Sequence, residues 1–151
     1  MRLTTKSQYG FQVLGQLVYN WQSSGNGYLQ VGELAIRSQT SAKYLEQVLL
    51  PLSQAGILES KRGKHGGYRL NRAPQDVSLA EVVRYLEGRL MPLPSWVEES
   101  GGSQSGLPDV LRRVRDTLRN ILENTSIEVL AESQADQKRL EEAAEALMYY
   151  I

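Results

Sequence analysis

Four neighbouring side chains could recognise the edges of DNA bases. They share the outward side of the first turns of a predicted helix: Lys43, Tyr44, Glu46 and Gln47. Glutamine can pair with N6 and N7 of adenine, glutamate can accept a hydrogen bond from N4 of cytosine, and lysine can reach guanine or a phosphate. A helix face of this composition is more often simply solvated, so these residues indicate base recognition only together with other features.

A second group could approach DNA from the tip of a hairpin. Residues 62–67 read Arg-Gly-Lys-His-Gly-Gly, between two short runs typical of strands. The glycines would let the backbone come close to DNA, and Arg62 and Lys64 would present positive charge to a minor groove or to phosphates. A basic, glycine-rich tip is by itself more often only a turn, and His65 is more often an exposed residue than a metal ligand.

The composition excludes several kinds of chemistry. The 151 residues include no cysteine and one histidine, which excludes disulfides, thiol catalysis and thiolate metal sites. There is no nucleophile paired with a base and no phosphate-binding loop, so we do not expect an enzyme. Neither an apolar run of about 18 residues nor an N-terminal signal core is found, so we expect a cytoplasmic protein without membrane contacts.

Charge is distributed unevenly along the chain. Residues 1–75 hold nine Lys and Arg against three Asp and Glu, a net charge of +6, whereas residues 76–151 hold eight against fourteen, a net charge of −6. This asymmetry favours a basic part that binds a partner and an acidic part with another role. Two differently solvated faces would explain the charges alone equally well.

Hydrophobic spacing predicts the elements that must position these residues. Thr5 opens a first helix, with Gln8 as its capping-box partner, and the helix ends before Ser23. The next elements are a short helix, a turn and a second helix, at residues 32–39, 40–41 and 42–55. This order is that of a helix-turn-helix. The side chains expected inward on the short helix are Leu34, Ala35 and Ile36.

Pro51 falls inside the second helix of this helix-turn-helix. It removes the backbone hydrogen bond to the carbonyl of Gln47 and crowds that group, at a cost of about 3 kcal/mol. We therefore expect a bend or a local break after Leu50, beyond the reading turn at residues 42–47.

A hairpin and a further helix complete the first half. Runs at residues 57–61 and 68–71 predict the two strands of a wing, and Ser78 and Glu81 form a capping box for a helix that ends at Gly88. The predicted fold class is mainly α with a small β-hairpin wing, a winged helix-turn-helix plus a long dimerisation helix. The predicted DNA-binding domain spans residues 1–88.

The second half is predicted to hold a loop and that dimerisation helix. Residues 89–106 contain two prolines and a Ser/Gly tract, and are predicted as a flexible loop with Trp96 as an anchor. Residues 107–151 are assigned to the dimerisation helix and the C-terminal helices. A heptad seam suited to self-association consists of Leu107, Leu111, Val114, Leu118 and Ile121.

The end of the chain reads as one more helix, at residues 134–149. The side chains expected inward on it are Leu140, Ala143, Ala144 and Leu147. Tyr149, Tyr150 and Ile151 could dock a partner or pack on the body of the chain itself.

Several motifs carry a family resemblance. They are Met1-Arg2-Leu3-Thr4-Thr5-Lys6, Ser41-Ala42-Lys43-Tyr44-Leu45-Glu46-Gln47, Gly56-Ile57-Leu58, Arg62-Gly63 and Gly66-Gly67-Tyr68-Arg69-Leu70. With these motifs the chain resembles the Rrf2 family of bacterial winged helix-turn-helix regulators, the family of IscR and CymR. The resemblance implies a homodimer that binds pseudo-palindromic operators.

The resemblance also implies roles for individual residues. Tyr44, Glu46 and Gln47 would read the major groove, and Arg62 and Gly63 would approach the minor groove. Lys43 stands where relatives often have serine. The start of the first helix would touch phosphates, through Arg2, Thr4 and Lys6.

The sequence departs from the cluster-binding members of this family. Those members carry three cysteines in the loop before the dimerisation helix, and residues 89–106 contain none, so we expect no iron–sulfur cluster. The signal would then be a small molecule in a pocket beside residues 89–106, a partner protein or the protein concentration. The alternative function is a protein-interaction adaptor that keeps the winged fold without binding DNA; the uneven charge favours DNA.

Overall fold

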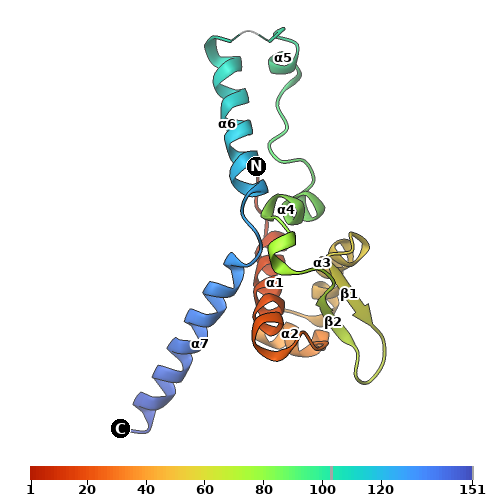
Figure 1. Cartoon of the computed structure of the whole chain (residues 1–151), viewed down its shortest axis with the longest axis vertical. Helices are drawn as coiled ribbons and strands as arrows, with labels where there is room; N and C mark the ends of the chain where they lie inside the picture. The colour runs from red at the N-terminus through yellow and green to blue at the C-terminus, as the bar shows by residue number, and fades with distance from the viewer. Residues whose placement is uncertain (103, 151) are drawn as a thin grey trace.

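The chain folds into a helical body with a short β-hairpin at one edge, and one long helix stands away from that body (Figure 1). The computed structural model describes residues 1–102 and 104–150, apart from the side chains of Ser133, Gln134, Gln137 and Leu140. The elements in chain order are α1 (Thr5–Ser24), α2 (Val31–Arg37), α3 (Ala42–Gln54), β1 (Leu58–Lys61), β2 (Gly67–Leu70), a 3-10 turn (Pro74–Asp76), α4 (Leu79–Glu87), α5 (Ser95–Glu98), α6 (Gly106–Glu123) and α7 (Val129–Met148). The predicted fold class is confirmed.

The core of the winged-helix part is built mainly from aliphatic side chains of α1 and α3. The fully buried ones on these helices are Val13, Leu14, Leu17, Val18, Leu45, Val48, Leu49 and Leu52. Each such side chain stabilises the fold by about 1.5–3 kcal/mol. On α2 the prediction is right for Leu34 and Ala35 but wrong for Ile36, which is 80% exposed because a two-turn helix buries only a narrow stripe.

Serine hydroxyls cap α3 and α4. The hydroxyl of Ser41 accepts a hydrogen bond from the amide of Tyr44, and Ser78 does the same for Glu81, at 3.1 Å each. The capping box at Thr5 and Gln8 is wrong, because Thr5 is already helical. Thr4 precedes it, and no side-chain hydrogen bond caps α1 from within its own first turn.

Helix α3 runs without a break through Pro51 as far as Gln54, so the local break predicted after Leu50 is wrong. Packing on both sides of the proline explains the continuity. Leu49 and Leu52 are both fully buried in the core, so a broken helix would remove apolar surface from it. The first turns of α3, which carry the candidate base-contacting residues, are therefore continuous with the buried remainder of the helix.

The wing is an antiparallel hairpin with a third segment beside it. Leu58 pairs with Leu70 and Lys61 with Gly67 across β1 and β2. Leu29 then forms a two-way backbone bridge with Tyr68, at 2.9 and 2.8 Å, on the other side of β2. The hairpin is thereby anchored to the segment that leads into α2.

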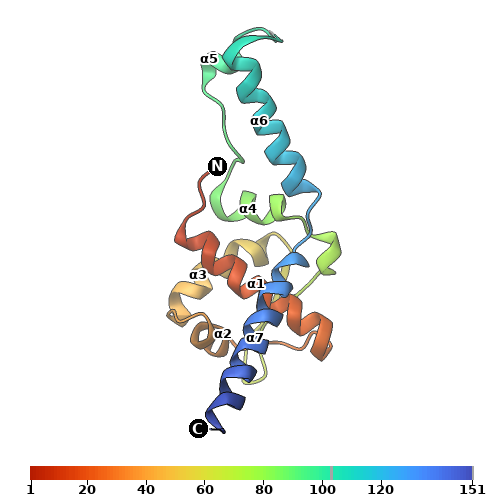
Figure 2. The same cartoon turned by 90° about the vertical axis from the view of Figure 1, so that its left-hand side faces the viewer.

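The C-terminal region is not separate from the first 88 residues. Figures 1 and 2 show α6 standing away from the body and α7 returning along α1. Ile127, in the link between these two helices, is fully buried in the core of the winged-helix part, and its amide donates to the carbonyl of Val77 at 2.9 Å. The amide of Leu79 likewise donates to the carbonyl of Thr125 at 2.8 Å.

Helix α7 differs from its prediction in its start and in its packing. It begins at Val129 rather than at residue 134. Ala143, Ala144 and Leu147 are exposed, so the inward packing expected for them is wrong. Tyr149 and Tyr150 are exposed as well, so of their two alternatives the packing on the body of the chain is not seen. The predictions for the Leu140 side chain and for Ile151 lie outside the described residues. Within the described ranges, no helix is long and apolar enough to span a membrane.

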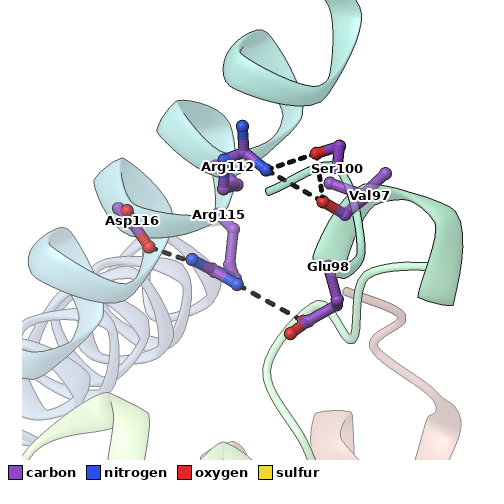
Figure 3. A network of polar contacts seen from close by, with 6 residues as sticks. All are labelled: Val97, Glu98, Ser100, Arg112, Arg115 and Asp116. Carbon is purple, nitrogen blue, oxygen red and sulfur yellow. Dashed lines mark hydrogen bonds and ion pairs between the residues drawn. The ribbon is translucent and has the colours of Figure 1, made fainter. Parts of the chain in front are cut away.

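The segment expected to be an irregular loop, residues 89–106, contains the short helix α5 and is tied to α6 (Figure 3). Arg112 donates to the carbonyl of Val97 and to the hydroxyl of Ser100, at 2.8 Å each. Arg115 forms an ion pair with Glu98 at 3.6 Å. Val97 is fully buried and is the anchor, whereas Trp96, predicted in that role, is 51% exposed.

Candidate nucleic-acid interface

The helix-turn-helix presents the first turns of α3 to solvent. Helix α2 ends at Arg37, and the amides of Ser38 and Thr40 donate back to Leu34 and Ala35, so the turn is closed by backbone bonds. Ser41 then caps α3. This local geometry follows from the sequence, because serine before a helix accepts from the helix's free amides.

The outer face of α3 carries the polar residues that the sequence singled out. Lys43, Glu46 and Gln47 are all exposed and share one face of the helix. Leu50, one turn further along this face, is 53% exposed, and sequence reasoning missed it. Leu50 follows Lys43 by seven residues, which is two helical turns, so the sequence alone could have placed it on this face. An apolar side chain at such a position can contact the methyl group of thymine.

Tyr44 lies differently from the other three. Its side chain is half-buried, and its ring meets that of Tyr9 edge to face, with centroids 5.6 Å apart and an interplanar angle of 79°. Such an edge-to-face contact contributes stabilisation in addition to that from the apolar area that the two rings bury. The ring of Tyr44 therefore fastens the start of α3 to α1, and only part of it remains accessible to a ligand.

The wing tip presents its basic residues to solvent. Arg62, Lys64 and His65 are exposed. The amide of Gly66 closes the tip by donating to the carbonyl of Gly63 at 3.0 Å, and the side chain of Gln30 donates to the carbonyl of Lys64 at 2.9 Å. The tip is thus held from the segment that precedes α2.

Helix α3 and the wing meet at Tyr68. Burial raises the pKa of the Tyr68 hydroxyl, and the negative charge of Glu46 raises it further. The Glu46 carboxylate therefore lies close enough to β2 to act on it electrostatically. Glu46 on α3 and Tyr68 on β2 are thus near each other.

The N-terminal candidates lie at the start of α1, beside the end of α4. Glu87 accepts hydrogen bonds from the amide of Thr4 at 2.9 Å and from the hydroxyls of Thr4 and Ser7 at 2.5 Å each. These bonds, that of Ser7 first, hold the pKa of the Glu87 carboxyl below its ordinary value. Thr4 thus already uses its amide and hydroxyl protons, while Arg2 is exposed and Lys6 is partly exposed.

Helix α6 carries a second candidate surface. Of the predicted seam, Leu111 and Leu118 are half-buried within the chain. An open apolar row, which we call the α6 row, consists of Leu107, Val110, Val114 and Ile121, each between 49% and 58% exposed. Val110 was not predicted, although it lies three residues from Leu107 and four from Val114, the spacing of one helix face.

The comparison with protein families gives one match over most of the chain. Residues 3–133 match the Rrf2 family, which is described as an iron-dependent transcriptional regulator. The match includes α1 to α6 and the start of α7, and therefore every candidate DNA-contacting residue except Arg2.

The donor set of this chain does not fit an iron–sulfur cluster. Such clusters are held by thiolates, and the sequence contains no cysteine. In the part of the chain that the structure describes, no group of three or more His, Asp or Glu side chains is placed to hold a metal ion. The residues of α5 and α6 that face each other are instead joined by arginine bonds.

Individual relatives agree with the family match. The chain is 31% identical to the HTH-type transcriptional regulator CymR of Bacillus subtilis over 151 residues, the full length of both chains. The structure of B. subtilis CymR, a global cysteine regulator, superposes with a TM-score of 0.74 at 28% identity, over 88% of this chain and 98% of that one. T. potens IscR gives 0.66 at 28% identity, over 91% of each chain. This chain therefore belongs to the Rrf2 family of transcriptional regulators.

Proposed function

We propose that the protein is a sequence-specific DNA-binding regulator that acts as a homodimer on a pseudo-palindromic operator. The observation that carries this proposal is the exposed row of Lys43, Glu46 and Gln47 on α3. The exposed basic tip of the wing offers a second contact. The chain carries out no catalysis in this scheme, and it acts in the cytoplasm, where operators are.

We expect three parts of the chain to contact DNA. The first turns of α3 enter the major groove, where Gln47 and Glu46 read bases. The wing approaches the minor groove through Arg62 and Gly63, with Lys64 near phosphates. At the start of α1, Arg2 and Lys6 bind phosphates, whereas Thr4 supports them through its bonds to Glu87.

The α6 row supports the homodimer. Its four side chains lie on a helix that stands away from the body, where the rest of the chain leaves them open. A second copy related by a two-fold axis would bury the same row on both chains. It would also repeat α3 on a second half-site, so that the symmetry of the operator mirrors that of the protein.

The controlling signal is a small molecule or a protein partner rather than a thiolate-bound cluster. The absence of cysteine supports this part of the proposal. Iron dependence, which the family description names, would need a donor set that the described residues do not provide.

Selection of genomic DNA fragments by the purified protein, read out by sequencing, tests the proposal. We expect an enriched motif with two inverted half-sites about one helical turn apart. The matched controls are Gln47→Ala, which should change the motif, and Gln54→Ala, an exposed residue at the far end of the same helix. Recovery of fragments without any shared motif would favour the adaptor function instead.

A further inference from the structure

A polar cavity of about 670 Å³ lies between α1, the end of α2 and α7. Its volume falls in the range of small-molecule sites, about 300–1,000 Å³. The cavity is not beside residues 89–106, where the sequence favoured an effector pocket. Its described wall comes from α1, Leu29, the turn after α2 and two residues of α7, Lys138 and Glu141.

The α1 side of the cavity carries buried hydrogen-bond acceptors without donors. Gln12 and Gln16 lie four residues apart and so share one face of α1. Gln16 is 7% exposed, and its amide nitrogen donates to the hydroxyl of Ser38 at 3.1 Å. Among the described residues, the Oε1 atoms of both glutamines are buried and have no partner. Because buried polar groups are normally hydrogen-bonded, these two oxygens lack the donor that their burial calls for.

Charges of both signs lie on the other side of the cavity, where the carboxylate of Glu141 lines the wall together with Lys138 and Arg37. Lys138 also forms an ion pair with Glu142 at 4.0 Å. The Lys138 ammonium donates to the hydroxyl of Tyr19 at 3.3 Å and lies 5.6 Å from the centroid of that ring. It thereby joins α7 to α1 across the cavity. Arg37, which is paired with Glu33, contributes a second cation to the wall.

We propose that this cavity binds a free amino acid or a close zwitterionic relative. Its ammonium group, which has three donors and no acceptor, would donate to the Oε1 atoms of Gln12 and Gln16 once a rotation of these side chains turns the oxygens toward the cavity. Its carboxylate would face Lys138 and Arg37, because charge-assisted bonds to these cations are the stronger kind. A simple anion would leave the glutamine oxygens unpaired, and a simple cation would make no use of Lys138 and Arg37.

A ligand in the cavity would contact the turn that precedes α3, the candidate DNA-reading helix. Ser38 and Gln39 line the cavity and lie in the turn between α2 and α3. A ligand on Gln16 therefore acts beside the one side-chain bond described between α1 and this turn. This regulatory consequence rests on the proposed function, whereas the binding site itself does not.

Isothermal titration calorimetry of the full chain tests the site. The probes are the common free L-amino acids, followed by the N-acetyl and carboxamide derivatives of whichever one binds. We expect at least one amino acid to bind. Its N-acetyl and carboxamide derivatives should each bind about tenfold more weakly or worse, because the first lacks the charged ammonium group and the second lacks the carboxylate. If no amino acid binds, the cavity holds only water and the proposal fails.

Two variants locate the binding. Gln12→Leu removes one acceptor and Lys138→Met removes the cation, and each should weaken the bound amino acid about tenfold. Arg139→Met is the matched control, because Arg139 is the next residue on α7, is exposed and does not line the cavity. A thermal melt verifies that Gln12→Leu folds, and Lys138→Met changes an exposed side chain. Unchanged binding by both variants would place the ligand elsewhere and overturn the proposal.

Fluorescence anisotropy with the selected operator, with and without the bound amino acid, tests the regulatory part. We expect operator affinity to change several-fold, and to stay constant in Lys138→Met. Unchanged affinity of the wild type would overturn the regulatory part alone. The calorimetry contains no DNA, so failure to find an operator would contradict the proposed function without touching the cavity.

Discussion

Gln47 has the side chain best placed to recognise a single base, because it is exposed on the outer face of α3 near Glu46. We expect Gln47→Ala to cost about 1–3 kcal/mol of discrimination at one base position. Lys64→Ala should instead weaken all sequences alike and reduce the slope of log affinity against log salt by about 1. Anisotropy titrations on the operator and its single-base variants measure both effects, and an unchanged base preference in Gln47→Ala would mean that α3 is not the reader.

Glu87 makes stability depend on pH. Its hydrogen bonds from Ser7 and Thr4 hold its folded pKa below the ordinary value of 4.5. The stabilisation is therefore present above that value and is lost as pH falls through the folded pKa. We expect the wild type to lose more stability between about pH 5 and pH 3 than Glu87→Gln does. Urea unfolding at a series of pH values measures this, with the exposed Glu99→Gln as control; parallel curves would contradict it.

Residue types alone indicated most of the interface but not its geometry. Lys43, Glu46 and Gln47 were predicted as outward and are exposed. The contact between Tyr44 and Tyr9 could not be predicted, since it depends on how α1 crosses α3. The engagement of Thr4 by Glu87 joins residues 83 positions apart, and no local pattern encodes such a pair.

At the scale of elements, the packing of α3 in the core opposes the local cost of Pro51, which removes a backbone hydrogen bond of the helix. Pro51→Ala would restore the hydrogen bond to Gln47, worth up to about 3 kcal/mol, while making the unfolded chain more flexible by about 0.4–1 kcal/mol. We expect a net gain of about 1–2 kcal/mol in the free energy of unfolding. Urea denaturation measures it against Gln54→Ala, and a less stable Pro51→Ala would show that the proline fits α3 without cost.

The wing depends on a close approach of two backbones. A Cβ atom on Gly67 would lie 2.0 Å from the carbonyl oxygen of Leu29, and the residue has a φ of 138°. We expect Gly67→Ala to break the bridge between Leu29 and Tyr68 and to lower operator affinity about tenfold or more, with helix content by circular dichroism retained. Gly32→Ala is the control, because nothing lies within 4 Å of a Cβ there. Unaltered operator affinity in Gly67→Ala would remove the wing from the interface.

Periodicity predicted the elements of the first half better than those of the second. In the first half, buried leucines at helical spacing mark α1 and α3 directly. In the second half, α7 begins at Val129 rather than at residue 134. Ile127, just before it, is buried by the winged-helix core, a contact that local spacing does not reveal. The short helix α5 depends on arginines of α6, which a local pattern cannot reveal.

For the molecule as a whole, the α6 row predicts the oligomeric state. Val114→Lys would place a charge in the centre of the proposed dimer interface and should give monomers. Asn120→Lys adds the same charge at an exposed position of α6 outside the row and should leave dimers intact. Because Val114 is 49% exposed in the single chain, its replacement should not unfold the monomer. Sedimentation velocity distinguishes the two states, and a dimer in Val114→Lys would assign dimerisation to another surface.

The burial of Ile127 has a consequence for the synthesis of the protein. Helix α1 leaves the ribosome early, yet part of its core is completed only when Ile127 and Ala131 have been made. Until then the nascent chain exposes apolar surface that chaperones recognise, and contacts that span so much sequence form slowly. A message cut before codon 127 therefore encodes every candidate DNA-contacting residue but not a finished core. Its product should be a substrate for proteolysis rather than a truncated competitor for the operator.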